Sequence, residues 1–300
     1  DLFRARLDYE ISDVWSVMYQ YGYSDSAVTS AGGGDRDPLL GNTNFGGTII
    51  NGTPVGTVEV FSHELQVQYS KGQWSGFVGA FSSETEDFDK FDLGVAALRG
   101  TDPIIVDPTD GILSGVFLNI PLTNAATDVF TDAIFGQISW TTLDGSLRVT
   151  AEGRYSDEEK VLDSNTTSQD DVIFRENWTE FTPRLSVDYQ LDDNQMVYAS
   201  IARGAKSGGF NNTVFNESQR AFEPDENWTT EIGSKNDLFD GKLRLNGAIY
   251  NTNWNGLQIN SSPIDIPVGI TPPAIVDNTG GANIIGLELD GAWLATDNLS

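Results

Sequence analysis

The chain has 300 residues and a formal net charge of -27, from 44 acidic and 17 basic side chains, with one histidine and no cysteine. The lack of cysteine excludes a disulfide framework, a thiolate zinc site and a thiol nucleophile. A strong negative charge argues against binding a phosphate backbone, so we expect no nucleic-acid partner. The sequence has no run of 18 apolar residues and shows no signal peptide at its start, but a membrane β-barrel needs no long apolar run.

Apolar and polar residues alternate from the beginning of the chain. Phe3 and Leu7 fall on one face of an extended segment, and Arg6 and Asp8 fall on the other. This period of two indicates β-strands with one apolar face, and it recurs down the chain. We expect about eleven antiparallel strands of roughly ten residues, long enough to cross a bilayer at a tilt. In chain order they cover 3–11, 15–23, 61–69, 73–83, 130–142, 147–155, 181–189, 194–204, 228–238, 243–249 and 282–294.

The predicted connections alternate strictly between short and long. Tight turns are expected at Ser12–Asp13, Lys71–Gly72, Asp144–Gly145, Asp192–Asn194 and Asp240–Gly241. Long polar loops are expected at about 25–58, 84–129, 157–177, 205–227 and 255–281. Outer-membrane barrels combine short periplasmic turns with long extracellular loops. The sequence therefore predicts an all-β fold, a transmembrane antiparallel β-barrel. The predicted number of strands is odd, and the first strand would begin on the extracellular side. We therefore expect the chain to be an interior part of a larger barrel.

Tryptophan is concentrated in or beside the predicted strands. Such placement is typical of the aromatic girdles found at the two bilayer interfaces. The girdle prediction covers Trp15, Trp74, Trp140, Trp178, Trp228, Trp254 and Trp293.

Several segments resemble the barrel of TonB-dependent outer-membrane receptors. The most specific runs from Val197 to Asn211 and reads VYASIARGAKSGGFN. The runs 231–235, 238–246 and 255–258 then resemble a strand, tight turn, strand and loop of that family in the same order. The resemblance extends through most of 60–300.

The resemblance implies a receptor in the bacterial outer membrane that takes up a scarce nutrient without catalysis or a cofactor. The expected substrate is a small molecule such as a metal chelate, with a ferric siderophore as the default, and cobalamin, carbohydrates and other nutrients are open. Energy would come from the TonB–ExbB–ExbD complex through a plug domain. Residues 1–300 would then form part of one barrel domain of about 22 strands, with the plug and the C-terminal strands outside the chain. Lipopolysaccharide and other outer-membrane lipids are further expected partners.

Two sets of residues are candidates for binding. Arg203, Lys206 and Asn211 belong to the segment that resembles the family, and they are expected to contact substrate or plug. Four loop carboxylates could hold a divalent cation, either Ca²⁺ or an ion that bridges to lipopolysaccharide phosphates, although a solvated acidic surface is the simpler interpretation. These are Asp35, Asp37, Asp87 and Asp89.

Two other functions remain open from the sequence. A passive porin-like channel would conduct ions without a plug. A secreted β-rich adhesin or carbohydrate-binding protein would be a monomer that needs no detergent. We expect no enzyme, because no set of side chains stands out as a catalytic constellation.

Overall fold

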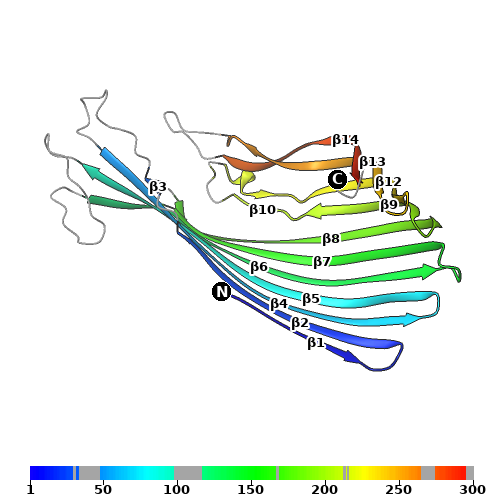
Figure 1. The fold of residues 1–300 in the computed structure, drawn as a ribbon. Helices are drawn as coiled ribbons and strands as arrows, with labels where there is room; N and C mark the ends of the chain where they lie inside the picture. Colours follow the sequence, from blue (N-terminus) through cyan, green and yellow to red (C-terminus); the bar gives the residue numbers. More distant parts are fainter. Residues whose placement is uncertain are drawn as a thin grey trace.

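A computed structural model describes residues 1–29, 32–33, 48–97, 117–166, 169–211, 214, 216–264 and 274–294. Eleven strands form one antiparallel sheet in the order β1-β2-β4-β5-β6-β7-β8-β9-β12-β13-β14, and β3 pairs with β4 at its margin (Figure 1). Each of the eleven pairs with its neighbours along the chain. The predicted number of strands and their antiparallel order are confirmed.

The bounds of the main strands are β1 (Leu2–Glu10), β2 (Trp15–Thr29), β4 (Thr48–Lys71), β5 (Trp74–Ala97), β6 (Phe117–Thr141), β7 (Leu147–Thr166), β8 (Gln169–Asp192), β9 (Gln195–Lys206), β12 (Asp225–Leu238), β13 (Leu243–Ser261) and β14 (Ile275–Trp293). The short elements are β3 (Gly32–Gly33), β10 (Gly209–Phe210), β11 (Ala221–Phe222) and the 3₁₀ helix η1 (Glu217–Gln219). The described residues contain no helix that is both long and apolar enough to cross a bilayer.

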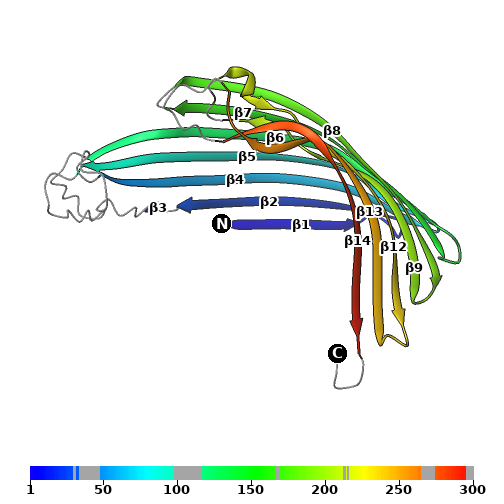
Figure 2. The same cartoon turned by 90° about the horizontal axis from the view of Figure 1, so that it is seen from above.

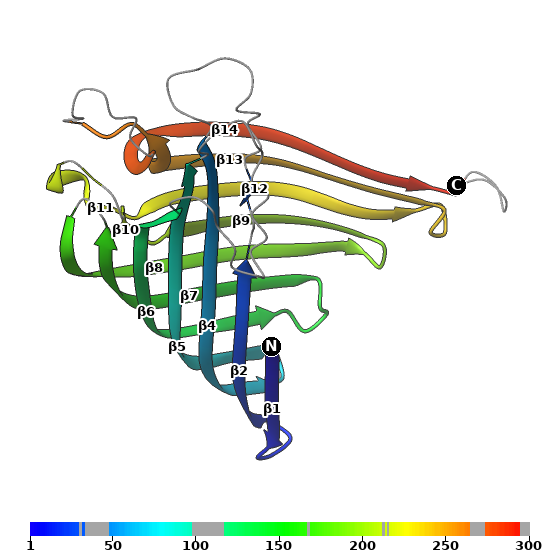
Figure 3. The same cartoon turned by 90° about the vertical axis from the view of Figure 1, so that its left-hand side faces the viewer.

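The sheet is curved and open. Figures 2 and 3 show that it curls so strongly that β14 runs across the direction of β1. Strong tilt and curl are what a sheet needs in order to close into a barrel. The tight turns gather at one end of the sheet, as the alternation of connections predicts (Figure 1).

Most strands are much longer than the sequence predicts. β4, β5 and β8 have 24 residues each, and β6 has 25. The predicted loops at 84–129 and 157–177 are therefore wrong in part, because β5 to β8 continue through much of both ranges. A strand that extends past the bilayer has water on both faces, so its alternation is lost while its backbone pairing continues.

The cross-strand register separates an apolar face from a polar face. Leu7, Tyr19 and Leu65 stand opposite one another on adjacent strands, and so do Arg6, Gln20 and Glu64. His63 shares the apolar face with Leu65. In a membrane barrel the apolar face meets lipid and the polar face lines the lumen.

The tryptophan girdle is only partly present. Trp74 pairs with Trp140 beside the tight turns on the apolar face, and Trp15 pairs there with Tyr69. Trp178 and Trp254 instead lie on the polar face, where Trp178 is only 7% exposed. The girdle prediction is wrong for these two, because they occupy alternate strand positions whose side chains point to the polar face.

Leu162 on β7 and Trp178 on β8 are buried at the end of the sheet away from the tight turns. A connection that folds back onto the sheet covers them, and it forms part of the candidate site.

Candidate ligand-facing surface

The connection between β9 and β12 lies against the polar face of the sheet. We call its described residues within 207–224 the inner segment. The Lys160 ammonium donates a hydrogen bond to the Gly208 carbonyl at 2.6 Å. The Gln258 side-chain amide donates to the carbonyl oxygens of Ser207 at 2.9 Å and Glu223 at 3.0 Å. The inner segment is thereby attached to β7 on one side and to β13 on the other.

Aromatic packing supports the same attachment. The rings of Trp178 and Phe210 lie 5.8 Å apart, and the Arg220 guanidinium stands 4.8 Å from the centre of the Phe174 ring. Arg220 is 3% exposed and also forms an ion pair with Glu217 at 2.9 Å. These contacts hold the inner segment against the polar face of the sheet.

Asn211 fastens the inner segment to β14. Its side-chain amide donates to the carbonyl oxygens of Gln219 at 2.8 Å and Val276 at 2.9 Å, and its side-chain oxygen accepts from the Val276 amide at 2.8 Å. The residue is 7% exposed. Because both amide protons are engaged, Asn211 serves as a structural anchor here. Its predicted contact with substrate or plug stays a prediction.

Arg203 lies just past the point where β8 and β9 stop pairing, at Arg184 and Ala202. It forms ion pairs with Glu180 at 2.9 Å and Glu226 at 2.6 Å, and it also donates to the Phe181 carbonyl. The guanidinium therefore links β8 to β12 near the point where β8 and β9 stop pairing. Its predicted role in substrate or plug contact also stays a prediction.

The remaining predicted residues do not form one site. Lys206 is exposed at the end of β9. Asp87 and Asp89 lie within β5 and not in a loop, a correction that follows from the greater strand length. Asp35 and Asp37 lie outside the described residues. Within the described part of the chain, no group of three or more acidic or histidine side chains is arranged to hold a metal ion.

A feature that the sequence reasoning missed is an arginine on an aromatic platform. The Arg154 guanidinium stands 5.0 Å from the centre of the Phe81 ring and 5.7 Å from that of Phe135. Phe77 supports Phe135 edge-on, with 6.0 Å between ring centres. Among the described residues, no carboxylate is within ion-pair distance of Arg154. The sequence signal for this platform is that Phe81 and Phe135 occupy alternate strand positions whose side chains point to the polar face.

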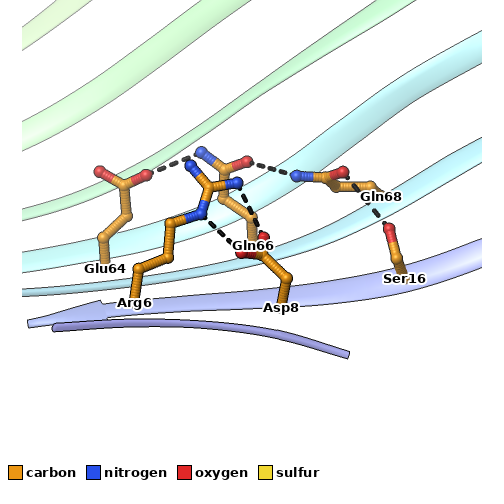
Figure 4. Close-up of polar contacts among 6 residues, drawn as sticks. All are labelled: Arg6, Asp8, Ser16, Glu64, Gln66 and Gln68. Atoms are coloured by element: carbon orange, nitrogen blue, oxygen red, sulfur yellow. Dashed lines mark hydrogen bonds and ion pairs between the residues drawn. The ribbon is translucent and has the colours of Figure 1, made fainter. Parts of the chain in front are cut away.

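A second missed feature is a ladder of polar side chains on β2 and β4, beside the Arg6–Asp8 ion pair of β1 (Figure 4). The Gln66 amide donates to Glu64 at 2.7 Å, and the Gln68 amide donates to Gln66 at 3.2 Å. The Ser16 hydroxyl continues the chain by donating to Gln68 at 3.3 Å. Beside it, near the tight turns, lies a cavity of about 540 Å³ that Ser16, Gln66 and Gln68 help to line. Such a surface can exchange hydrogen bonds with a polar partner.

Comparison with known proteins decides the family. The family described as TonB dependent receptor-like, beta-barrel, matches residues 1–300, the whole chain. The chain belongs to the TonB-dependent receptor β-barrel family. As a member of this family, it is a receptor-type barrel of the bacterial outer membrane.

Individual relatives are distant. The pesticin receptor of Yersinia enterocolitica is 27% identical over 111 residues, which are 37% of this chain and 15% of that receptor. Among solved structures, the ferripyoverdine receptor of Pseudomonas aeruginosa has a TM-score of 0.66 at 17% identity, covering 98% of this chain and 38% of that one. BauA, the ferric preacinetobactin receptor of Acinetobacter baumannii, has a TM-score of 0.64 at 15% identity, covering 98% and 42%. The TonB-dependent receptor chain thus spans less than half the length of these two structures, and the likeness to them establishes the fold.

Proposed function

We propose that this TonB-dependent receptor takes up a ferric siderophore across the outer membrane. The family supports nutrient uptake. The names of two similar structures specify ferripyoverdine and ferric preacinetobactin as what those proteins bind. Uptake of this kind needs no chemical catalysis, so we also propose that the protein is not an enzyme.

The observation that carries the substrate proposal is Arg154 on the polar face. A guanidinium that stacks on Phe81 and Phe135 keeps its N–H groups available for a ligand. Ferric chelates present anionic oxygens, which a guanidinium binds with charge-assisted hydrogen bonds. The two phenylalanine rings, which are partly buried, would pack against the organic part of such a chelate.

Energy for uptake would come from the TonB–ExbB–ExbD complex, acting on a plug domain within the barrel. The polar ladder and its neighbouring cavity suit a plug contact, because they offer amide donors and acceptors near the tight turns. Binding and energised uptake are then separable steps.

The test uses the full-length receptor in cells deprived of iron. We expect radiolabelled ferric siderophore to enter wild-type cells and to bind, without entering, cells that lack TonB. Arg154→Ala should weaken binding by about tenfold, the loss typical of one charge-assisted contact. Arg244→Ala is the control, because Arg244 also lies on the polar face but is paired with Asp237 at 2.9 Å. Equal binding by the two variants would contradict the role of Arg154.

The two rival functions predict different measurements. A porin would give steady conductance in a planar bilayer, whereas a receptor with a plug should stay closed. An adhesin would remain a monomer without detergent. The outward apolar side chains argue against the adhesin, because Ile134, Ile232 and Leu287 are each more than half exposed.

A further inference from the structure

The apolar face carries a groove that crosses five strands. Tyr19, Leu65, Ala80, Ile134 and Tyr155 stand in one row, each opposite the next on β2, β4, β5, β6 and β7. Ala80 is the smallest member and stands at the centre. The larger side chains on either side leave a cavity of about 550 Å³, which all five of these residues line.

The groove lies in the half of the apolar, lipid-facing band that is distant from the tight turns. His63, which also lines it, comes six residues before Tyr69 on β4. A tilted strand climbs about 2.5 Å per residue, so the two differ in height by about 15 Å in a band about 25 Å tall. Because the tight turns are periplasmic in such barrels, the groove opens toward the outer leaflet.

The upper rim of the groove is polar. The Tyr19 hydroxyl and the His63 ring nitrogen Nδ1 are 2.8 Å apart and hydrogen-bonded. Asp132 and Asp157 also line the cavity, and the side-chain amide of Asn177 donates to Asp157 at 2.5 Å. Apolar walls below polar groups match a molecule that has a hydrocarbon tail and a polar head.

We propose that this groove binds one acyl chain of lipid A, the membrane anchor of lipopolysaccharide. The groove belongs to the lipid-facing surface that the family membership assigns to this barrel, so hydrocarbon covers it in the native membrane. The height of the groove within this band places it in the outer leaflet, which in Gram-negative bacteria consists of lipopolysaccharide. The chain would lie on Ala80 between Leu65 and Ile134, and the uncharged sugar hydroxyls of the lipid head would lie nearer the rim than its phosphates, because Asp132 and Asp157 repel negative charge. This site is independent of what the receptor imports.

The test compares two alanine positions in the full-length receptor, purified from outer membranes in mild detergent. Ala80→Trp fills the floor of the groove. Ala199→Trp is the matched control, because Ala199 is also exposed on the apolar face, between Val187 and Ile232, but does not line the groove. Native mass spectrometry then measures the lipid that remains bound to each protein.

We expect wild type and Ala199→Trp to retain lipid A, and Ala80→Trp to retain about tenfold less. Equal retention by all three proteins, or a glycerophospholipid as the retained species, would overturn the proposal.

A second measurement covers the case in which Ala80→Trp does not assemble. A photo-crosslinking benzoylphenylalanine at Ile134, on the wall of the groove, should join to lipopolysaccharide that stays with the receptor through purification in mild detergent. The same group at Ile232, outside the groove, should do so much less. Equal crosslinking at both positions would also overturn the site.

Discussion

At the scale of single residues, two polar side chains anchor distant segments to each other. Asn211 joins the inner segment to β14 across 65 sequence positions, and Lys160 joins it to β7 across 48. Such buried bonds matter because an unpaired amide inside the wall would have no water to replace the lost partner.

Replacing Asn211 with alanine should loosen the inner segment. The variant loses three hydrogen bonds at a buried position, and we expect a cost of about 2 kcal/mol to local stability. Hydrogen exchange of the backbone amides in β10 and β11 measures it. Asn251→Ala is the control, because Asn251 is only partly buried and, among the described residues, its side chain bonds only to Asn283, at 3.1 Å. Unchanged protection in Asn211→Ala would contradict the anchor.

Asp144, in the β6–β7 turn, should make stability depend on pH. Hydrogen bonds from the Thr142 hydroxyl at 2.6 Å and the Ser146 amide at 3.1 Å lower the pKa of this carboxyl. A lowered folded-state pKa stabilises the turn above the unfolded value, about 3.9, and the gain is lost as pH falls through the folded value.

Asp144→Asn should therefore unfold more readily than wild type at neutral pH, and the difference should close below about pH 4. Denaturant unfolding of the refolded barrel at several pH values measures this difference. Asp193→Asn, in the β8–β9 turn, controls for the loss of one negative charge. A difference that persists at low pH would contradict the role of the charged turn.

At the scale of strands, tyrosine rings on the polar face cover glycines of the next strand. Tyr198 in β9 stands opposite Gly233 in β12, and a side-chain carbon added to Gly233 would lie 2.6 Å from the ring. The Tyr198 hydroxyl continues across the strand and donates to Glu231 at 2.6 Å. The ring thus shields a backbone that has no side chain of its own.

Gly233→Ala should destabilise this strand pair by about 1–3 kcal/mol, because the ring must leave its position. Adding Tyr198→Ala should recover part of the loss, and a double-mutant cycle in urea unfolding measures the coupling. Gly291→Ala is a matched control, since a carbon there meets nothing closer than 3.7 Å. Additive effects of the two substitutions would contradict the covering role of the ring.

At the scale of the whole molecule, the sheet is open. β1 pairs only with β2, and β14 pairs along the main sheet only with β13, as far as the described residues extend. Lipid cannot satisfy the free hydrogen-bonding groups of a sheet edge, so we predict that other strands pair with both edges in the membrane.

Intact mass spectrometry of the native polypeptide from outer membranes should therefore find a protein at least about twice as long as the 300-residue chain, as a barrel of about 22 strands requires. A native polypeptide of 300 residues would contradict the larger barrel. Its two edges would then have to pair with other chains.

The sequence alone determined the number of strands, their two faces and the tight turns, because these features depend on neighbouring residues. Alternation around Leu65 assigns faces within one strand, and Asp144–Gly145 forms its turn locally, with φ of +76° at the glycine. The tertiary structure decided how far strands continue beyond the bilayer, which tryptophans turn inward, and where Asn211 and Arg154 lie. These depend on partners far along the chain, such as Val276 for Asn211 and Phe81 for Arg154, and a local pattern does not encode such contacts.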